Sequence, residues 1–265
     1  MPAHRKGGLA MPVMDEFREE REALKHGTPK QKFRYFLDYY KWHVVAAVAI
    51  IVFAASMIYN MATRKEMAFS VSLVNAFDIG TGEEQLASFA EYAGIDTEEF
   101  DVMADSSMQI DYTSTDQNTA ASLQKLMVLV AAGEIDALLS DEAVIEQYAY
   151  SETFYDLRDV LTAQQLEAYE PYFFYMDQAV AEAISEAQMD PDYDSNAMPE
   201  RPDPRKPEAM EQPVPVGICL GEAKALNETY VFLGGEGILA VPATSPNLET
   251  VPKYVDFILE PQAAQ

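Results

Sequence analysis

The sequence is poor in the residues that build most familiar active sites. Among 265 residues there is one cysteine, Cys219, so no intramolecular disulfide can form. All three histidines, His4, His26 and His43, lie within the first 43 residues. The rest of the chain therefore has no Ser-His-Asp triad, Cys-His pair or histidine-ligated zinc site. We predict a protein that is not an enzyme and needs no cofactor or metal, with a carboxylate-dependent hydrolase as the least favoured alternative.

Charge is absent from one stretch and uneven elsewhere. Residues 42–62 contain no Asp, Glu, Lys or Arg. Residues 1–41 carry nine basic and six acidic side chains, a net charge of +3, whereas residues 63–265 carry nine basic and 38 acidic ones, a net charge of −29. The total of −26 argues against nucleic acid as a partner, because such binding depends on neutralising phosphates.

The uncharged stretch has the length and composition of a transmembrane helix. Val44–Met61 has 18 residues, of which only Ser56 and Asn60 are clearly polar. A hydrocarbon core of roughly 30 Å needs about 20 such residues, which the flanking positions supply. A buried core helix is the first alternative, but no polar stripe is visible. A cleaved signal peptide is the second, but this run exceeds the usual h-region of about 7–15 residues.

The flanks of the span predict its orientation. Lysine and arginine are concentrated on the amino-terminal side, at Lys25, Lys30, Lys32, Arg34 and Lys41, against Arg64 and Lys65 on the other side. The positive-inside rule then places residues 1–41 in the cytoplasm and residues 66–265 outside the cell membrane. The sequence from Thr28 to Gln31 has the pattern of a capping box with Pro29 at the first helical position. The aromatic residues between this cap and the span fit a membrane interface, or alternatively a docking surface for a cytoplasmic partner.

The body, residues 66–265, is predicted to be an α/β domain. Over residues 69–73, 108–112 and 135–139 the pattern favours strands, and each of the two intervals between them has helical spacing. The two helices and their capping glycines are 86–93 with Gly94 and 123–130 with Gly133. This alternation favours a parallel or mixed sheet with flanking helices.

The second half of the body is less regular. Residues 141–188 are predicted to be helical, with a capping box at Thr162 and Gln165 and an aromatic cluster over 169–175. Further elements are expected as strands at 214–220, 230–233 and 237–241, and as a helix from Thr250.

A Pro-rich loop, residues 189–215, interrupts this half. It holds seven of the fifteen prolines, so it is predicted to be neither helix nor central strand. Within it, Asp190, Asp192, Asp194 and Asn196 begin like a calcium loop, but Arg201 stands where a bidentate glutamate is needed. A solvated loop is therefore favoured over a calcium site.

Three passages of the body resemble bacterial extracellular solute-binding proteins, which have the type 2 periplasmic-binding-protein fold and serve ABC importers. The passages are Ala132–Ser140 (AGEIDALLS), Phe154–Leu161 (FYDLRDVL) and Gly237–Glu249 (GILAVPATSPNLE). The resemblance implies one lobe of that fold, since 200 residues are few for a two-lobed member. It also implies binding of a small solute rather than catalysis. The alternative is an envelope scaffold or assembly protein that kept the fold and lost the small ligand.

The fold indicates where a ligand would bind. Open α/β sheets bind ligands at the carboxyl ends of their strands, near helix amino termini. The candidate ligand-binding residues are Asn75, Asp78, Ser114, Thr115, Asp116, Gln117, Ser140 and Asp141. The alternative is that these side chains are helix caps and turn residues, for which Asp116 and Ser140 are chemically suited. Expected partners are membrane lipid through residues 42–62 and either a small solute or an envelope protein.

Overall fold

The computed structural model describes residues 28–189 and 199–259. The chain divides into two compact units, one up to Arg64 and one from Lys65 onward. Each unit is described by itself. The calcium-like residues Asp190, Asp192, Asp194 and Asn196 lie outside the described ranges, as does most of the amino-terminal segment.

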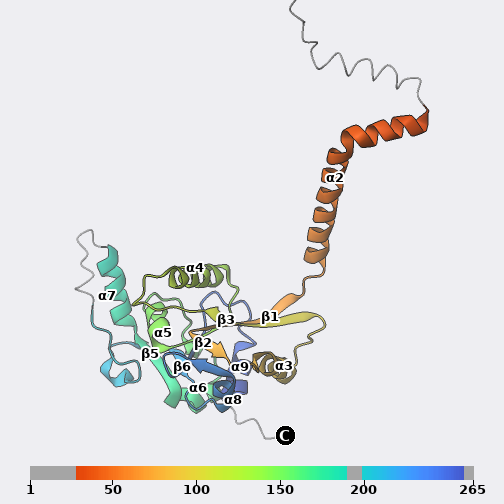
Figure 1. The fold of residues 1–265 in the computed structure, drawn as a ribbon. Coiled ribbons are helices and arrows are strands. Elements are labelled where there is room, and N and C mark those ends of the chain that lie inside the picture. The colour runs from red at the N-terminus through yellow and green to blue at the C-terminus, as the bar shows by residue number, and fades with distance from the viewer. Residues whose placement is uncertain (1–27, 190–198, 260–265) are drawn as a thin grey trace, which may run out of the picture. The chain divides into compact units, whose positions relative to one another are not determined.

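The first unit contains one long helix, α2 (Pro29–Ala62), which begins at the proline that the sequence places at its first position. Figure 1 shows that α2 bends once, so that a shorter part precedes a longer one. Its stretch Trp42–Ala62 has 21 residues, a mean hydropathy of 2.2 and no residue buried inside the structure. By length and composition this stretch is sufficient to cross a membrane.

The second unit is built on a six-stranded mixed sheet with the order β3-β1-β4-β8-β6-β5. On one side, β1 (Glu66–Val74) runs parallel to both β3 (Phe100–Met108) and β4 (Ala137–Ser140). On the other side, β8 (Ile238–Ala240), β6 (Pro213–Cys219) and β5 (Phe173–Asp177) are added in antiparallel pairs. The predicted α/β class with a parallel or mixed sheet is confirmed.

A separate two-stranded sheet pairs segments that lie far apart in the sequence. Its strands are β2 (Ala76–Asp78) and β7 (Tyr230–Phe232), which are antiparallel. We call this pair the ribbon. Since β2 follows β1 after the single residue Asn75, the ribbon lies at the carboxyl end of β1.

Helices connect the strands and cover the sheet. They are α3 (Gly82–Ala93), α4 (Gln117–Ala132), α5 (Glu142–Ala149), α6 (Ala163–Tyr169), α7 (Gln178–Met189), α8 (Lys224–Thr229) and α9 (Val251–Leu259), with short 3-10 helices at Leu157–Asp159, Glu170–Tyr172 and Pro207–Ala209. The predicted caps are present: Gly94 and Gly133 have φ of 72° and 65°, and Thr162 and Gln165 form a reciprocal capping box. These local patterns therefore set the helix ends.

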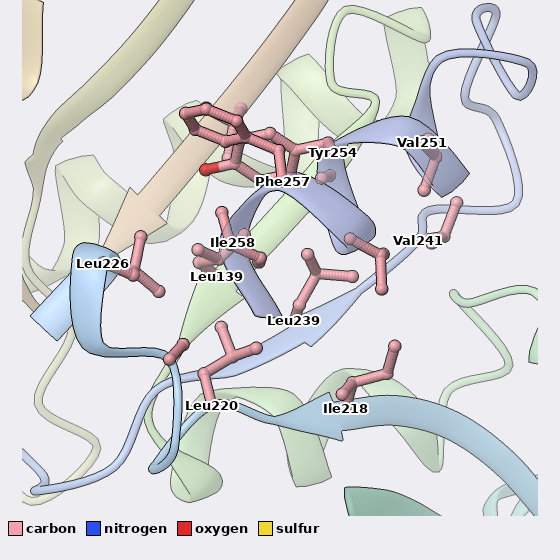
Figure 2. Close-up of a cluster of buried hydrophobic side chains, with 14 of the residues drawn as sticks. Leu139, Ile218, Leu220, Leu226, Leu239, Val241, Val251, Tyr254, Phe257 and Ile258 are labelled. Carbon is pink, nitrogen blue, oxygen red and sulfur yellow. The ribbon is translucent and has the colours of Figure 1, made fainter. Parts of the chain in front are cut away.

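The core consists of two apolar clusters. One packs side chains of α3, α8 and α9 against the sheet and includes Phe69, Phe89 and Tyr254. Figure 2 shows part of it, with Leu139 and Leu239 facing α9. The ring centroids of Phe89 and Tyr254 lie 4.9 Å apart in an edge-on arrangement, which is the favoured geometry for aromatic pairs. The other cluster involves α4, α5 and α7. A sheet covered by apolar clusters from different helices matches the α/β architecture.

The prediction of a wholly helical segment over 141–188 was wrong in part, because β5 occupies Phe173–Asp177. Phe173 belongs to one core cluster and its neighbour Phe174 to the other. This alternation is the period of a strand that is buried on both faces. Of the aromatic cluster, Phe173–Tyr175 therefore lie in the sheet, whereas Tyr169 ends α6 and Tyr172 ends a 3-10 helix. The helical elements next to β5 in the sequence hide this strand from pattern analysis.

The prediction that 189–215 contains no central strand was also wrong at its end. Strand β6 begins at Pro213 and lies between β8 and β5. Pro213 is the first residue of the strand, where a missing N–H is tolerated. Pro215 pairs with Tyr175 next to a register shift, and the N–H of Tyr175 donates instead to the carbonyl of Pro204, at 2.8 Å. The irregularity accommodates the proline that lacks a donor.

Candidate functional site at the carboxyl edge of the sheet

Asn75 connects the end of β1 to the ribbon. It has a φ of 57°, a left-handed conformation that asparagine tolerates better than most residues. Its side chain is 5% exposed, and its Nδ2 donates to the carbonyl of Ile110 and to Oδ2 of Asp141, both at 2.8 Å. Its Oδ1 accepts from the N–H of Ile110 at 2.7 Å. Asn75 therefore joins three chain segments.

Ser140 and Asp141 lie beside Asn75, as the parallel sheet predicts. The hydroxyl of Ser140 donates to the carbonyl of Val74 at 3.1 Å. Asp141 is the amino-terminal cap of α5, where its Oδ1 accepts from the N–H of Val144 at 3.2 Å. The expectation of Ser140 as a cap was wrong by one residue, since the aspartate that follows it takes that position.

Three of the remaining predicted residues, Asp78, Ser114 and Asp116, make local hydrogen bonds. Oδ1 of Asp78 accepts from the backbone N–H groups of Gly80, Thr81 and Gly82, at 2.7–3.1 Å. Asp116 caps α4 by accepting from two backbone N–H groups, as expected from its chemistry, and the hydroxyl of Ser114 donates to its other oxygen. These hydrogen bonds hold the pKa of Asp116 below its usual value. Thr115 and Gln117 flank that cap, and Gln117 is the first residue of α4.

The expected strand at residues 108–112 was misplaced, since β3 spans Phe100–Met108 and shares only Met108 with that prediction. Ile110 is buried, but its backbone bonds to the side chain of Asn75 instead of a neighbouring strand. Two residues further on, Tyr112 is 44% exposed, and the partial burial of its phenol, followed by the nearby Tyr148 and Asp141, raises its pKa to about 12. At neutral pH this phenol stays protonated, as an unperturbed tyrosine with a pKa of about 10 also does.

The end of the ribbon closes over this edge of the sheet. The N–H of Leu233, just after β7, donates to the carbonyl of Asn75 at 2.8 Å. Gly234 then passes so close to Asp141 that a Cβ at this glycine would lie 2.5 Å from the Cβ of Asp141. The protein's own backbone therefore occupies the space next to the buried Asn75–Asp141 pair.

A groove lies next to this edge, between α4 and α5. It has a volume of about 440 Å³ and is lined largely by apolar and aromatic side chains. The lining residues are Tyr112, Leu123, Met127, Val130, Ala131, Gln147, Tyr148, Ser151 and Thr153. A groove of this kind suits an apolar ligand rather than a sugar or an amino acid, which needs several convergent polar groups.

Sequence reasoning missed a second polar centre, at Asp136. This side chain is 1% exposed and accepts from the N–H of Ser70, the hydroxyl of Ser245 and both nitrogens of Asn247, at 2.8–3.2 Å. In the sequence, the only signal for these hydrogen bonds is the presence of Ser245 and Asn247, two polar residues in the segment after β8. Asp136 holds the chain after β8 against β1 and β4, so its role is to fix the fold.

Sequence reasoning also missed the outer face of the ribbon. The side chains of Phe77 and Val231 are paired across the two strands and are 44% and 51% exposed. Ile79 and Leu233, which follow the two strands, are 60% and 61% exposed. We call these four side chains the ribbon face. The alternation of apolar residues around β7 predicts a strand, but only the pairing with β2 brings the four together.

Comparison of the chain with protein-family models, with curated proteins and with solved structures finds no match. Within residues 28–189 and 199–259, no group of three or more His, Cys, Asp or Glu side chains is arranged to hold a metal ion.

Proposed function

We propose that this is a single-pass membrane protein whose α/β unit lies outside the cell and binds a partner protein of the envelope without catalysing a reaction. The apolar stretch Trp42–Ala62 serves as a permanent membrane anchor in this proposal. The excess of basic residues before it supports a cytoplasmic amino terminus, and the charge of −29 after it supports an exposed, solvated outer unit.

One observation favours a protein partner over a small polar solute. At the carboxyl edge of the sheet, the predicted ligand-binding groups of Asn75, Ser140 and Asp141 are buried and bonded to one another or to backbone. The backbone at Gly234 fills the space beside them. A solute would have to displace these contacts, and an unsatisfied buried polar group costs about 1–3 kcal/mol.

The arrangement of the three passages that resemble solute-binding proteins supports a reduced lobe of that fold. Asp136, in the first passage, accepts hydrogen bonds from Ser245 and Asn247 in the third. Phe154, in the second, bridges to Pro242 in the third. Passages that are separated in the sequence thus form one contiguous region. We propose that the protein kept this architecture and uses it as a binding scaffold.

The groove between α4 and α5 supports a second candidate function, the binding of a small apolar solute. Its volume of about 440 Å³ lies within the range of small-molecule sites, roughly 300–1,000 Å³. Met127, which lines it, is 62% exposed. In this case the groove, and not the carboxyl edge of the sheet, would hold the ligand.

Ligand-dependent stability of the full chain in lipid nanodiscs separates the two functions. A ligand at 100 times its Kd raises the free energy of unfolding by about 2.7 kcal/mol, which a thermal scan detects. We expect no shift with sugars, amino acids or Ca²⁺, and a reproducible covalent partner after crosslinking in cells that binds again when both proteins are purified. A solute that stabilises the native protein but not a Met127→Glu variant would favour the groove instead.

A further inference from the structure

We propose that the ribbon face is the docking surface for a cationic amphipathic segment of a partner protein, a segment in which lysine or arginine residues border an apolar stripe. This inference rests on the proposed function and assigns the surface that carries it. The evidence comes from the geometry of the ribbon, the exposure of its side chains and the charges of its two segments.

The ribbon has two different faces. Ala76 pairs with Phe232, and Asp78 pairs with Tyr230. Of these four, Ala76, Phe232 and Tyr230 are at most 5% exposed, so this face packs inward. Side chains alternate along a strand, so Phe77 and Val231 point the other way, and both are about half exposed. The outward face of a half-buried strand is ordinarily polar, whereas this one presents aromatic and aliphatic side chains.

The ribbon face is held in place by the fold. Beyond the paired residues, the N–H of Ile79 donates to the carbonyl of Thr229 at 3.0 Å, and that of Leu233 donates to the carbonyl of Asn75 at 2.8 Å. The buried hydrogen bonds of Asn75 then tie the ribbon to Asp141. A preorganised apolar surface binds a partner without paying for the ordering of its own side chains and backbone.

The two segments that form the ribbon carry only negative charge. Residues 66–124, which include β2, contain twelve Asp or Glu and no Lys or Arg. Residues 225–252, which include β7, contain three Asp or Glu and no Lys or Arg. Complementary charge steers association and rejects partners of the same sign. The occupant should therefore be basic around an apolar centre.

This charge also argues against two other occupants. A second copy would bring two sets of acidic segments together, and like charges in an interface are costly. An anionic membrane surface would be repelled for the same reason. A cationic amphipathic segment satisfies both the apolar side chains of the ribbon face and the excess of acidic residues in the two segments that form the ribbon.

The test uses the full chain in zwitterionic nanodiscs and a fluorescent 18-residue peptide of leucine and lysine with helical periodicity. Binding is followed by anisotropy, with the signal from empty nanodiscs subtracted. We expect Val231→Asn and Leu233→Asn each to weaken binding at least tenfold, and 0.5 M NaCl to weaken it as well. Val128→Asn, a comparably exposed change on α4 outside the groove, is the matched control and should leave binding unchanged.

Two peptide controls separate charge from apolar contact. A peptide with glutamate in place of lysine, and one with glutamine in place of leucine, should both fail to bind. Equal binding of the leucine–lysine peptide to the native protein and to both ribbon variants would overturn the inference. Binding of the glutamate peptide would overturn it too. So would a dimer of the native protein that Val231→Asn abolishes, because a second copy would then occupy the ribbon face. If the ribbon variants still crosslink to the same partner in cells, this surface is wrong while the proposed function stands. Thermal scans of each variant check that it is folded.

Discussion

Asp136 shows how a single residue holds distant parts of this chain together. Its two side-chain oxygens accept four hydrogen bonds: one from Ser70 of β1, and three from Ser245 and Asn247 in the segment after β8. Removing the acceptor leaves several buried donors without partners, and each costs about 1–3 kcal/mol. We expect Asp136→Ala to lower the free energy of unfolding by about 3 kcal/mol or more, measured by chemical denaturation followed by circular dichroism.

The matched control for this change is Asp101→Ala. Asp101 is also an aspartate of the sheet region, but it lies on β3 and is exposed. Surface substitutions away from special features change stability by less than about 0.5 kcal/mol. A small effect at both positions would show that the hydrogen bonds of Asp136 are replaced by water, contrary to its burial.

Cys219 is the one thiol of the chain, and its surroundings determine its reactivity. It is 3% exposed, and burial raises its pKa to about 11, against a small opposing effect of Arg205. Only the thiolate reacts with maleimide, and its fraction falls when the pKa rises. We expect negligible labelling of the folded protein from pH 7 to pH 9 and complete labelling in denaturant, measured by mass spectrometry. Rapid labelling of the folded chain at pH 8 would contradict this environment.

At the scale of elements, two glycines end helices in the same conformation but in different surroundings. Gly94 and Gly133 follow α3 and α4 with φ of 72° and 65°. A Cβ at Gly94 would meet open space, whereas one at Gly133 would lie 2.8 Å from the carbonyl oxygen of Thr244. The left-handed conformation alone costs an L-residue roughly 1–2 kcal/mol.

The pair gives a prediction that separates conformational strain from steric overlap. We expect Gly94→Ala to destabilise the protein by about 1 kcal/mol, and Gly133→Ala to cost at least about 1 kcal/mol more because Thr244 must shift. Both are measured by thermal denaturation of the full chain. Equal losses would mean that the segment around Thr244 moves without cost.

Local rules predicted the ends of several elements better than their pairing. The caps at Gly94, Gly133 and Thr162 and the start of α9 follow from short sequence patterns that act within one turn of helix. The strand β5 was missed because an apolar run shows no period that distinguishes a strand buried on both faces from a helix. Pairing of β2 with β7 joins residues about 150 positions apart, and no local pattern encodes such a contact.

The topology predicted that three of the eight candidate residues lie together, but not whether their polar groups are available to a ligand. Parallel strands place Asn75, Ser140 and Asp141 together, as the topology requires. Whether polar side chains remain available to a ligand depends on what packs over them, and here the segment at Gly234 does so. The ribbon face was missed for the same reason, since it exists only after two remote segments pair.

At the scale of the whole molecule, charge is divided by the apolar stretch. Five basic residues lie between Lys25 and Lys41, whereas Arg64 and Lys65 are the basic residues directly after residue 62. Basic residues close to the ends of a span determine which side stays in the cytoplasm, and acidic residues contribute little to that choice. The proposed orientation thus depends on the flanks and not on the charge of −29 that follows.

Labelling of introduced cysteines tests this orientation directly. Met127→Cys places a thiol at a position that is 62% exposed in the second unit, and His26→Cys places one before the apolar stretch. The buried native Cys219 gives little background. With a membrane-impermeant maleimide on intact cells freed of their wall, we expect Met127→Cys to react at once and His26→Cys only after the membrane is permeabilised. The reverse pattern would invert the orientation. Labelling of both introduced thiols on intact cells would exclude a membrane anchor at residues 42–62, because a span would place a bilayer, which the reagent does not cross, between the two thiols.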